Sequence, residues 1–222
     1  MIHAGKAVRA ALKLILLAAL ILGSLAVITS LVSTYISGAL LVVWILFAIF
    51  TFYFFRDPTA QGVDEHLAIV SPAHGTVDHI DETIEPQFML GPCRRVSIFL
   101  SVVDVHVQKA PVSGKVLYLR HTSGRFLNAM KADSAQHNEN VMIGVEPSHA
   151  AGERIGLKLI AGLIARRIIP WIQVGESVER GQRISLIQFG SRCDLYVPLN
   201  YKIRAKLGQK VIGGESILAV KN

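Results

Sequence analysis

The segment PAHGTV, residues 72–77, and the segment PVSGKV, residues 111–116, share the pattern PxxGxV. A second pattern, GxxVxxGxxI, occurs at residues 175–184 and again at residues 208–217, an offset of 33 residues (208 minus 175). Two patterns that each occur twice predict two similar β half-units, and their glycines suit the tight turns between short strands. We therefore expect a mainly β domain with a duplicated architecture, similar to the barrel-sandwich hybrids of lipoyl and biotinyl carrier domains.

The remainder of the chain after Leu67 also favours β structure. Short apolar runs are separated by Gly, Pro and Asn, which is typical of many short strands. The apolar stretch 155–169 fits either a strand pair or a helix, and residues 122–140 are predicted to form a long loop that could cover a binding site. The clearest strand-like runs are residues 96–102, 115–120, 141–145 and 183–188.

The N-terminal part is strongly apolar, because no charged residue occurs from Leu14 to Phe55. This span of 42 residues is about twice the roughly 20 residues that one bilayer crossing requires. Small polar residues interrupt it near its middle, as a turn between two helices would. We therefore predict a transmembrane helical hairpin, with helices at about residues 11–32 and 37–55.

The charges around this hairpin predict its orientation. Lys6, Arg9 and Lys13 precede the first helix and Arg56 follows the second, so the positive-inside rule places both ends in the cytoplasm. We expect residues 1–55 to anchor the chain in the cell's inner membrane and residues 56–222 to form a domain facing the cytoplasm. A cleaved signal peptide is the alternative, and the second apolar run argues against it.

The balance of basic and acidic residues indicates which kinds of partner the chain can bind. The chain has a formal net charge of +7, and after residue 55 it carries 20 Lys and Arg against 16 Asp and Glu, or 20 minus 16, giving +4. A nucleic-acid groove would show a denser basic stripe with aromatic residues. The mild excess favours an anionic lipid surface and no nucleic-acid partner. The densest basic pair, Arg166 and Arg167, fits a phosphate contact and a solvated end of an element equally well.

Metal chemistry is not predicted. Cys93 and Cys193 are far apart and lack metal-ligand spacing, which indicates free thiols in a reducing compartment. His74 and His79 are five residues apart, so on one continuous strand they would point to opposite faces. No Cys or carboxylate set completes a ligand cluster around them.

The tetrapeptide Phe189-Gly190-Ser191-Arg192 lies between two strand-like runs. Gly190 lacks a β-carbon, so its peptide can adopt geometries that other residues resist, and the Ser191 hydroxyl can then reach the preceding carbonyl. The bond between them is thus a candidate for self-cleavage. The alternative is a hairpin corner, because Gly-Ser is an ordinary turn dipeptide. A serine hydrolase is disfavoured, because the GxSxG elbow is missing.

A set of stretches resembles the short, membrane-anchored branch of the phosphatidylserine decarboxylase proenzyme family, whose members depend on a pyruvoyl group. The set runs in family order across almost the whole chain from Phe54 onward. It consists of FFRDP (54–58), SPAHG (71–75), FLSVVDVHVQKAPVSGKV (99–116), GRFLNA (124–129), NEN (138–140), GLIARRI (162–168) and RGQRISLIQFGSRCDLYVP (180–198).

This resemblance implies self-cleavage between Gly190 and Ser191 into chains of residues 1–190 and 191–222, with conversion of Ser191 to an N-terminal pyruvoyl group. That covalent cofactor would form a Schiff base with the amine of phosphatidylserine and accept electrons as carbon dioxide leaves, giving phosphatidylethanolamine. The implied partners are the phosphatidylserine substrate, the membrane and the two fragments themselves as a heterodimer, which can oligomerise further.

The resemblance also assigns proton-transfer roles. His106 matches the histidine of the family's DVH pattern, and Asp104 would share its face on a strand; a half-exposed strand histidine is the alternative. His74 stands where family members usually carry the aspartate of SPADG, an acid thought to orient the base for self-cleavage, and histidine could itself act as a base. Lys109 stands where the longer branch carries histidine.

A different class of function also fits the fold. A membrane-tethered barrel-sandwich domain could be a non-enzymatic adaptor, with Gly-Ser as a plain turn. A prosthetic-group carrier would need an exposed lysine at a hairpin tip, and the tip segments 180–181 and 213–214 contain none. In the enzyme interpretation, the loop 122–140, with Phe126, Leu127 and Met130, would line the headgroup entrance.

Overall fold

The structure is a computed structural model that describes residues 3–30, 33–125, 127, 137–162, 167–188 and 191–221. The chain divides into two compact units, one formed by residues 4–57 and the other mainly by residues 58–222. The first unit is helical and the second is built from β-strands. Each unit is treated separately below.

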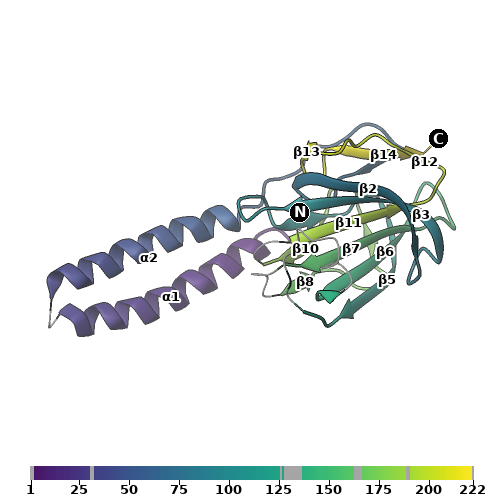
Figure 1. The fold of residues 1–222 in the computed structure, drawn as a ribbon. Coiled ribbons are helices and arrows are strands. Elements are labelled where there is room, and N and C mark those ends of the chain that lie inside the picture. Colours follow the sequence, from purple (N-terminus) through teal and green to yellow (C-terminus); the bar gives the residue numbers. More distant parts are fainter. Residues whose placement is uncertain are drawn as a thin grey trace. The chain divides into compact units, whose positions relative to one another are not determined.

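The helical unit consists of α1 (Lys6–Ser30) and α2 (Thr34–Phe54), both long and apolar enough to cross a membrane (Figure 1). Two apolar N-terminal helices were predicted and are confirmed, but α1 begins five residues before the predicted start at residue 11. The added residues 6–10 include Lys6 and Arg9, whose charges interrupt the apolar run, although Ala, Lys and Arg all favour helix. The apolar pattern alone therefore placed the start too late.

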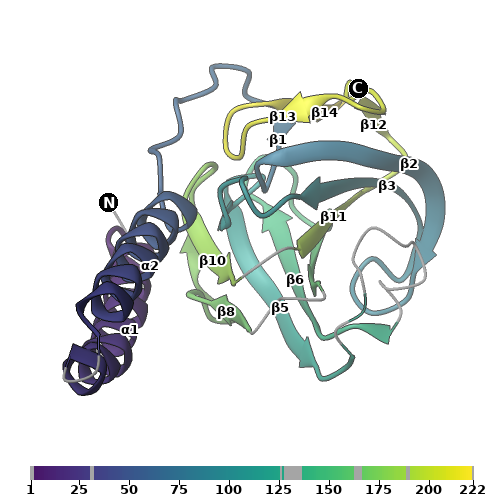
Figure 2. The ribbon, with the colours of Figure 1, turned by 60° about the vertical axis from the view of Figure 1, so that its left-hand side comes forward.

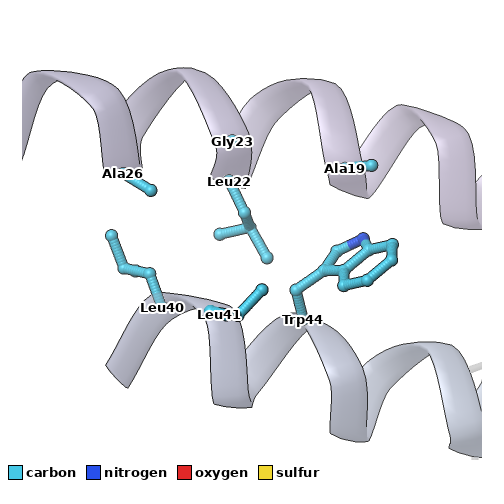
Figure 3. A pocket seen from close by; sticks show the side chains of 7 residues that line it. All are labelled: Ala19, Leu22, Gly23, Ala26, Leu40, Leu41 and Trp44. Carbon is cyan, nitrogen blue, oxygen red and sulfur yellow. The ribbon is translucent and has the colours of Figure 1, made fainter. Parts of the chain in front are cut away.

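The two helices lie side by side as a hairpin. The Trp44 indole NH approaches the Ile15 carbonyl oxygen at 3.5 Å, and the Ser37 hydroxyl donates to the Ala26 carbonyl at 3.2 Å. Small residues on α1 let the backbones approach closely. An apolar pocket remains between the helices (Figure 3) and is lined by Ala19, Leu22, Gly23, Ala26, Leu40, Leu41 and Trp44.

The β unit contains a long, strongly curled sheet flanked by two small sheets (Figures 1 and 2). The long sheet has the strand order β13-β2-β3-β11-β7-β6-β5-β9, and the small sheets have the orders β1-β14-β12 and β4-β10-β8. The strands are β1 (Ala68–Val70), β2 (Gly75–Glu85), β3 (Gly91–Leu100), β4 (Val107–Lys109), β5 (Gly114–Thr122), β6 (Asn140–Pro147), β7 (Ile155–Ala161), β8 (Ile168–Pro170), β9 (Ser177–Val178), β10 (Arg183–Ile187), β11 (Ser191–Val197), β12 (Tyr201–Ile203), β13 (Lys210–Val211) and β14 (Ile217–Lys221).

The strand order shows the duplication that the repeated patterns predicted. The first repeat consists of β1–β3 and β11–β14, and the second consists of β4–β10, which is inserted between β3 and β11. The order β13-β2-β3-β11 in one repeat corresponds to β9-β5-β6-β7 in the other, and β1-β14-β12 corresponds to β4-β10-β8. The two repeats meet where β11 pairs antiparallel with β7.

The shared glycine of the PxxGxV pattern is required for the same structural reason in both repeats. A β-carbon on Gly75 would lie 2.3 Å from the Phe99 carbonyl oxygen, and one on Gly114 would lie 2.1 Å from that of Glu146. Each glycine therefore lets a strand approach its neighbour more closely than any side chain allows. The same strands also bulge shortly after these glycines, between Val77 and His79 in one case and between residues 116 and 118 in the other.

Both faces of the central strand β11 are buried. Cys193, Leu195 and Val197 belong to the large hydrophobic core, to which both repeats contribute. Tyr196 points to the opposite face, as the alternation of a strand requires, and there it joins a smaller cluster with Phe88, Cys93 and Met142. The start of β11 is thus enclosed on both sides.

The predicted strands at residues 96–102, 115–120, 141–145 and 183–188 are confirmed as β3, β5, β6 and β10. The ambiguous stretch 155–169 forms the strands β7 and β8, which belong to different sheets. The predicted loop between β5 and β6 falls largely on residues outside those described.

Candidate active site

Two connections join the two repeats, and two predicted site residues, His106 and Ser191, lie on or directly after them. Residues 101–106 lead from β3 to β4, and residues 188–190 lead from β10 to β11. The Ile187 NH donates to the His106 carbonyl oxygen at 3.1 Å, and Ser191 lies opposite Leu100 in the β3–β11 ladder. The described residues that flank the second connection, Ile187 and Ser191, therefore lie beside the two ends of the first, at one end of the curled sheet.

Ser191 is the first residue of β11, with β3 on one side and β7 on the other. The residue is completely buried, and its Oγ has no hydrogen-bond partner among the described residues. A buried polar atom without a partner is costly and is often found where it takes part in chemistry. Phe189 and Gly190 lie outside the described residues, so the geometry of the predicted scissile bond is not described.

His106 is completely buried within the crossover that precedes β4. Its Nδ1 lies 2.8 Å from the Asp104 carbonyl oxygen. A carbonyl oxygen only accepts, so Nδ1 donates and a neutral ring has its lone pair on Nε2. That tautomer can take up a proton at Nε2. The alternative of a half-exposed strand histidine is wrong, because the residue is buried and precedes the strand.

The expectation that Asp104 and His106 share one face of a strand is also wrong. Residues 101–106 form a turn, closed by a hydrogen bond of 3.0 Å from the Asp104 NH to the Ser101 carbonyl. The Asp104 carboxylate accepts from the Ser101 NH at 2.9 Å and from its hydroxyl at 2.7 Å. The chain here leaves one sheet for another, so the two-residue period of a strand does not apply. Asp104 stabilises the crossover.

His74 lies in the turn between β1 and β2, half-buried, and not on a strand. A β-carbon on Gly213 would lie 3.1 Å from its ring, so the 213–214 hairpin tip packs against it. Thr76, Phe99 and Arg192 lie side by side across β2, β3 and β11. His74, two residues before Thr76, is therefore at the same end of the sheet as Ser191.

Lys109 ties these segments together. It is completely buried on β4, where its Nζ donates to the Pro58 carbonyl oxygen at 3.3 Å. Its backbone NH donates to the Pro72 carbonyl oxygen at 2.8 Å, which links the turn that carries His74 to the segment that carries His106. The structure thus brings His74, His106 and Ser191 to one region.

A group of buried charges that the sequence did not predict lies beside Ser191. The Arg192 guanidinium donates to Asp78 Oδ2 at 2.7 Å and to Asp194 Oδ1 at 3.1 Å. Burial raises the pKa of the Asp78 carboxyl, and the charge of Arg192 partly offsets this. Burial also lowers the pKa of Lys158, which faces Asp194 in the β7–β11 ladder. The two-residue spacing of Arg192 and Asp194 on one strand was the only sequence signal for this group.

The other residues that the sequence analysis named add less to the candidate active site. Arg167 is exposed, while Arg166, Phe126 and Met130 lie outside the described residues. Cys93 and Cys193 are buried, free thiols. Within the described part of the chain, no group of three His, Cys, Asp or Glu residues could hold a metal ion.

These features define a class of protein: a duplicated β domain with a buried serine at a junction between its repeats, in the same region as a histidine that can accept a proton. The family model described as phosphatidylserine decarboxylase matches residues 47–219. Since this match covers most of the sequence, the chain belongs to the phosphatidylserine decarboxylase family, whose members are carboxy-lyases. Membership supports the enzyme interpretation and not the adaptor.

Individual relatives with the same name support the family assignment. A phosphatidylserine decarboxylase proenzyme of Desulfotalea psychrophila is 40% identical over 176 residues, which are 79% of this chain and 81% of that protein. A proenzyme of Syntrophus aciditrophicus is 42% identical over 170 residues, 77% of this chain and 79% of the relative. A third, from a Wolbachia endosymbiont (Wolbachia sp. subsp. Brugia malayi), is 41% identical over 179 residues, 77% of this chain and 75% of the relative.

Proposed function

We propose that this chain is a pyruvoyl-dependent phosphatidylserine decarboxylase that matures by cutting itself between Gly190 and Ser191. The observation that carries the proposal is the buried Ser191 Oγ without a hydrogen-bond partner among the described residues. It belongs to the residue that opens a central strand, and both neighbouring strands hold its backbone. A hydroxyl so placed is desolvated and available for attack on the preceding carbonyl.

Maturation converts Ser191 to the pyruvoyl group in three steps. Ser191 Oγ attacks the Gly190 carbonyl carbon and the peptide bond becomes an ester. Loss of the α-proton of residue 191 then expels the Gly190 carboxylate by β-elimination, which leaves dehydroalanine at the start of the smaller chain. Water replaces its nitrogen, which departs as ammonia, and a pyruvoyl group remains. When formed, that group supplies an electron sink for decarboxylation of an amino acid headgroup.

The proton transfers fall to residues of this chain. His106 is the proposed proton-transfer residue, because its Nδ1 is held by the Asp104 carbonyl oxygen and Nε2 then carries the lone pair of a neutral ring. His74 is proposed to assist self-cleavage from the neighbouring turn, in the place of the usual family aspartate. Neither role requires a metal.

The two fragments would stay together after cleavage. The smaller chain, residues 191–222, contains β11, β13 and β14, which pair with β3 and β7, with β2 and with β1 respectively. All four of those partner strands belong to the larger chain, residues 1–190. The mature enzyme is therefore proposed to be an interwoven heterodimer, able to oligomerise further.

The helical unit suggests where the enzyme works. We propose that residues 1–55 anchor it in the inner membrane, with the domain of residues 56–222 facing the cytoplasm. Phosphatidylserine is embedded in the bilayer, so an anchor holds the site at high effective concentration of its substrate. The basic residues in the first turns of α1, Lys6, Arg9 and Lys13, and Arg56 after α2 support this orientation.

Intact-mass measurement on the purified full chain tests this proposal. We expect two fragments split after residue 190, the smaller one with a blocked N-terminus, and loss of vesicle phosphatidylserine decarboxylation after phenylhydrazine treatment. Ser191→Ala should remain one inactive chain. Ser97→Ala is the matched control, because the Ser97 Oγ is also buried without a partner among the described residues, and it should mature normally. A wild-type chain that stays whole would leave only a lipid-tethered β domain.

A further inference from the structure

The side chain next to the predicted cut is fixed between two carboxylates. Arg192 is 5% exposed at its side chain, Asp194 is 1% exposed and Asp78 is 29% exposed. Arg192 Nη1 lies 2.7 Å from Asp78 Oδ2, and Nε lies 3.1 Å from Asp194 Oδ1. Hydrogen bonds between ionised groups are stronger than neutral ones. This arrangement, called here the Arg192 clamp, therefore ties β11 to β2 across the intervening strand β3.

Asp78 reaches Arg192 because β2 is irregular at that point. The β2–β3 register shifts between Val77 and His79, so Asp78 is the extra residue of a β-bulge. Bulges redirect side chains and are frequent beside active sites. Asp78 Oδ1 and Asp194 Oδ2 are both buried without a hydrogen-bond partner among the described residues. Together with the raised pKa of Asp78, this indicates that the clamp carries an energetic cost, as functional sites often do.

The second repeat shows that the fold does not need the clamp. The registers of β5–β6 and β6–β7 match those of β2–β3 and β3–β11, bulge included, as far as the pair Val145–Ile155, where the β6–β7 ladder ends. The equivalent positions are Leu117 for Asp78 and Gly156 for Asp194, and the register continued one residue before the start of β7 gives Arg154 for Arg192. Arg154 donates to the Phe88 carbonyl at 3.0 Å. The two-carboxylate arrangement is thus specific to the repeat that carries Ser191.

We propose that Arg192, through Asp78 and Asp194, is a positioning residue that holds residue 191 in the site once the chain has been cut. The inference rests on the proposed function, because cleavage makes residue 191 a chain end, and chain ends fray unless tied down. Arg192 points to the face of β11 opposite Ser191, so it acts through the backbone and does not touch the reacting atoms.

The test compares Arg192→Met with Arg154→Met, its equivalent in the second repeat, in the full-length protein. We expect Arg192→Met to be cut, as measured by intact mass. Its kcat on phosphatidylserine vesicles, per cut chain, should fall about 10-fold to 100-fold, because small displacements of a reacting group cost this much. KM should stay within about twofold, and amide exchange at residues 192–197 should accelerate. Arg154→Met should keep wild-type kcat.

Asp78→Asn provides a second variant if Arg192→Met does not fold. Its kcat should also fall. The kcat of the double variant should be no lower than that of Arg192→Met alone, because both substitutions act through one contact. The proposal is overturned if a cut, folded Arg192→Met chain keeps its kcat, if Arg154→Met loses as much, or if folded Arg192→Met stays uncut, since the clamp would then act on cleavage itself. An uncut wild-type chain would instead contradict the proposed function.

Discussion

The two repeats of the β unit share a backbone and differ in the side chains at one end. Both have a glycine where a strand crosses its neighbour too closely for a β-carbon, and both bulge shortly afterwards. The shared PxxGxV pattern makes Ser113 the equivalent of His74, and the strand register continued two residues before the start of β7 makes Glu153 the equivalent of Ser191. Glu153 accepts from the Tyr201 hydroxyl at 2.8 Å and pairs with Lys221 at 2.9 Å. Ser191, by contrast, has a buried hydroxyl without a partner among the described residues.

This difference separates what the fold requires from what the site requires. Features present in both repeats, such as the glycine and the bulge, are architectural. Features present only in the first repeat or on the crossovers, such as His74, His106 and the Arg192 clamp, are candidates for chemistry. Each prediction below tests whether a residue belongs to the architectural or the functional set.

The largest effect is expected at His106. This residue lies on a connection between the repeats, so it does not belong to the architecture that the two repeats share. Replacing a proton-transfer residue typically costs about 100-fold to 10,000-fold in rate. His106→Gln should therefore lower kcat per cut chain by at least about 100-fold, measured as carbon dioxide release from phosphatidylserine vesicles. His149→Gln alters a half-buried histidine outside the site and serves as the control. A loss of less than tenfold would remove His106 from the proton-transfer role.

The next largest effect concerns architecture, and both repeats should show it. Gly75→Ala and Gly114→Ala each force a β-carbon against a neighbouring carbonyl oxygen. Each should lower the free energy of unfolding by about 3 kcal/mol, as overpacking of a rigid site does. Chemical denaturation of the purified variants measures this. If only the first-repeat variant were destabilised, the assignment of the glycine to the shared architecture would fail.

A smaller effect is expected at His74, which differs from its equivalent Ser113. If His74 assists self-cleavage through one hydrogen bond, about 1–1.5 kcal/mol, then His74→Ala should slow the cut about fivefold to tenfold. His74→Asp, which restores the usual family residue, should cut at least as fast as wild type. Ser113→Ala should have no effect. Pulse-labelled protein followed on a denaturing gel gives these rates of self-cleavage. If all three variants were cut at the same rate, His74 would be a turn residue only.

The sequence predicted the architecture better than the site. Two patterns, each occurring twice, were enough to predict the duplicated β domain, because both repeats require the same glycines and prolines at the same turns. The ordered family stretches also pointed to Ser191 and His106. Both inferences depended on residues adjacent in sequence or repeated along it.

What could not be predicted depends on contacts between distant residues. The contact of Asp78 with Arg192 requires a bulge in β2 and a reach across β3, and neither leaves a local pattern. Asp104 and His106 are two residues apart, which on a strand would place them on one face, yet the chain crosses between sheets at that point. Period-two patterns do not reveal where a strand ends when both flanking segments are buried.

The smallest expected effect compares two aspartates on β2. Burial tends to raise the pKa of Asp81, but hydrogen bonds of 2.9 and 2.6 Å from Arg95 outweigh it and lower that pKa. Ionised Asp81 therefore stabilises the fold above its ordinary pKa of about 3.8, and this contribution is lost as pH falls through the lowered value. The pKa of Asp78 is raised instead, so the ionised Asp78 carboxylate destabilises the fold at neutral pH. This destabilisation disappears in acid, where the carboxyl is protonated.

Asp81→Asn should accordingly lower the Tm at pH 7 by about 2 °C, as expected for a partly exposed ion pair, and by less near pH 3. Asp78→Asn should leave the Tm at pH 7 unchanged or slightly raised while kcat falls. Thermal unfolding of both variants at the two pH values tests this. If Asp78→Asn lost as much stability as Asp81→Asn at pH 7, the Arg192 clamp would belong to the architecture and the contrast between the repeats would not identify the site.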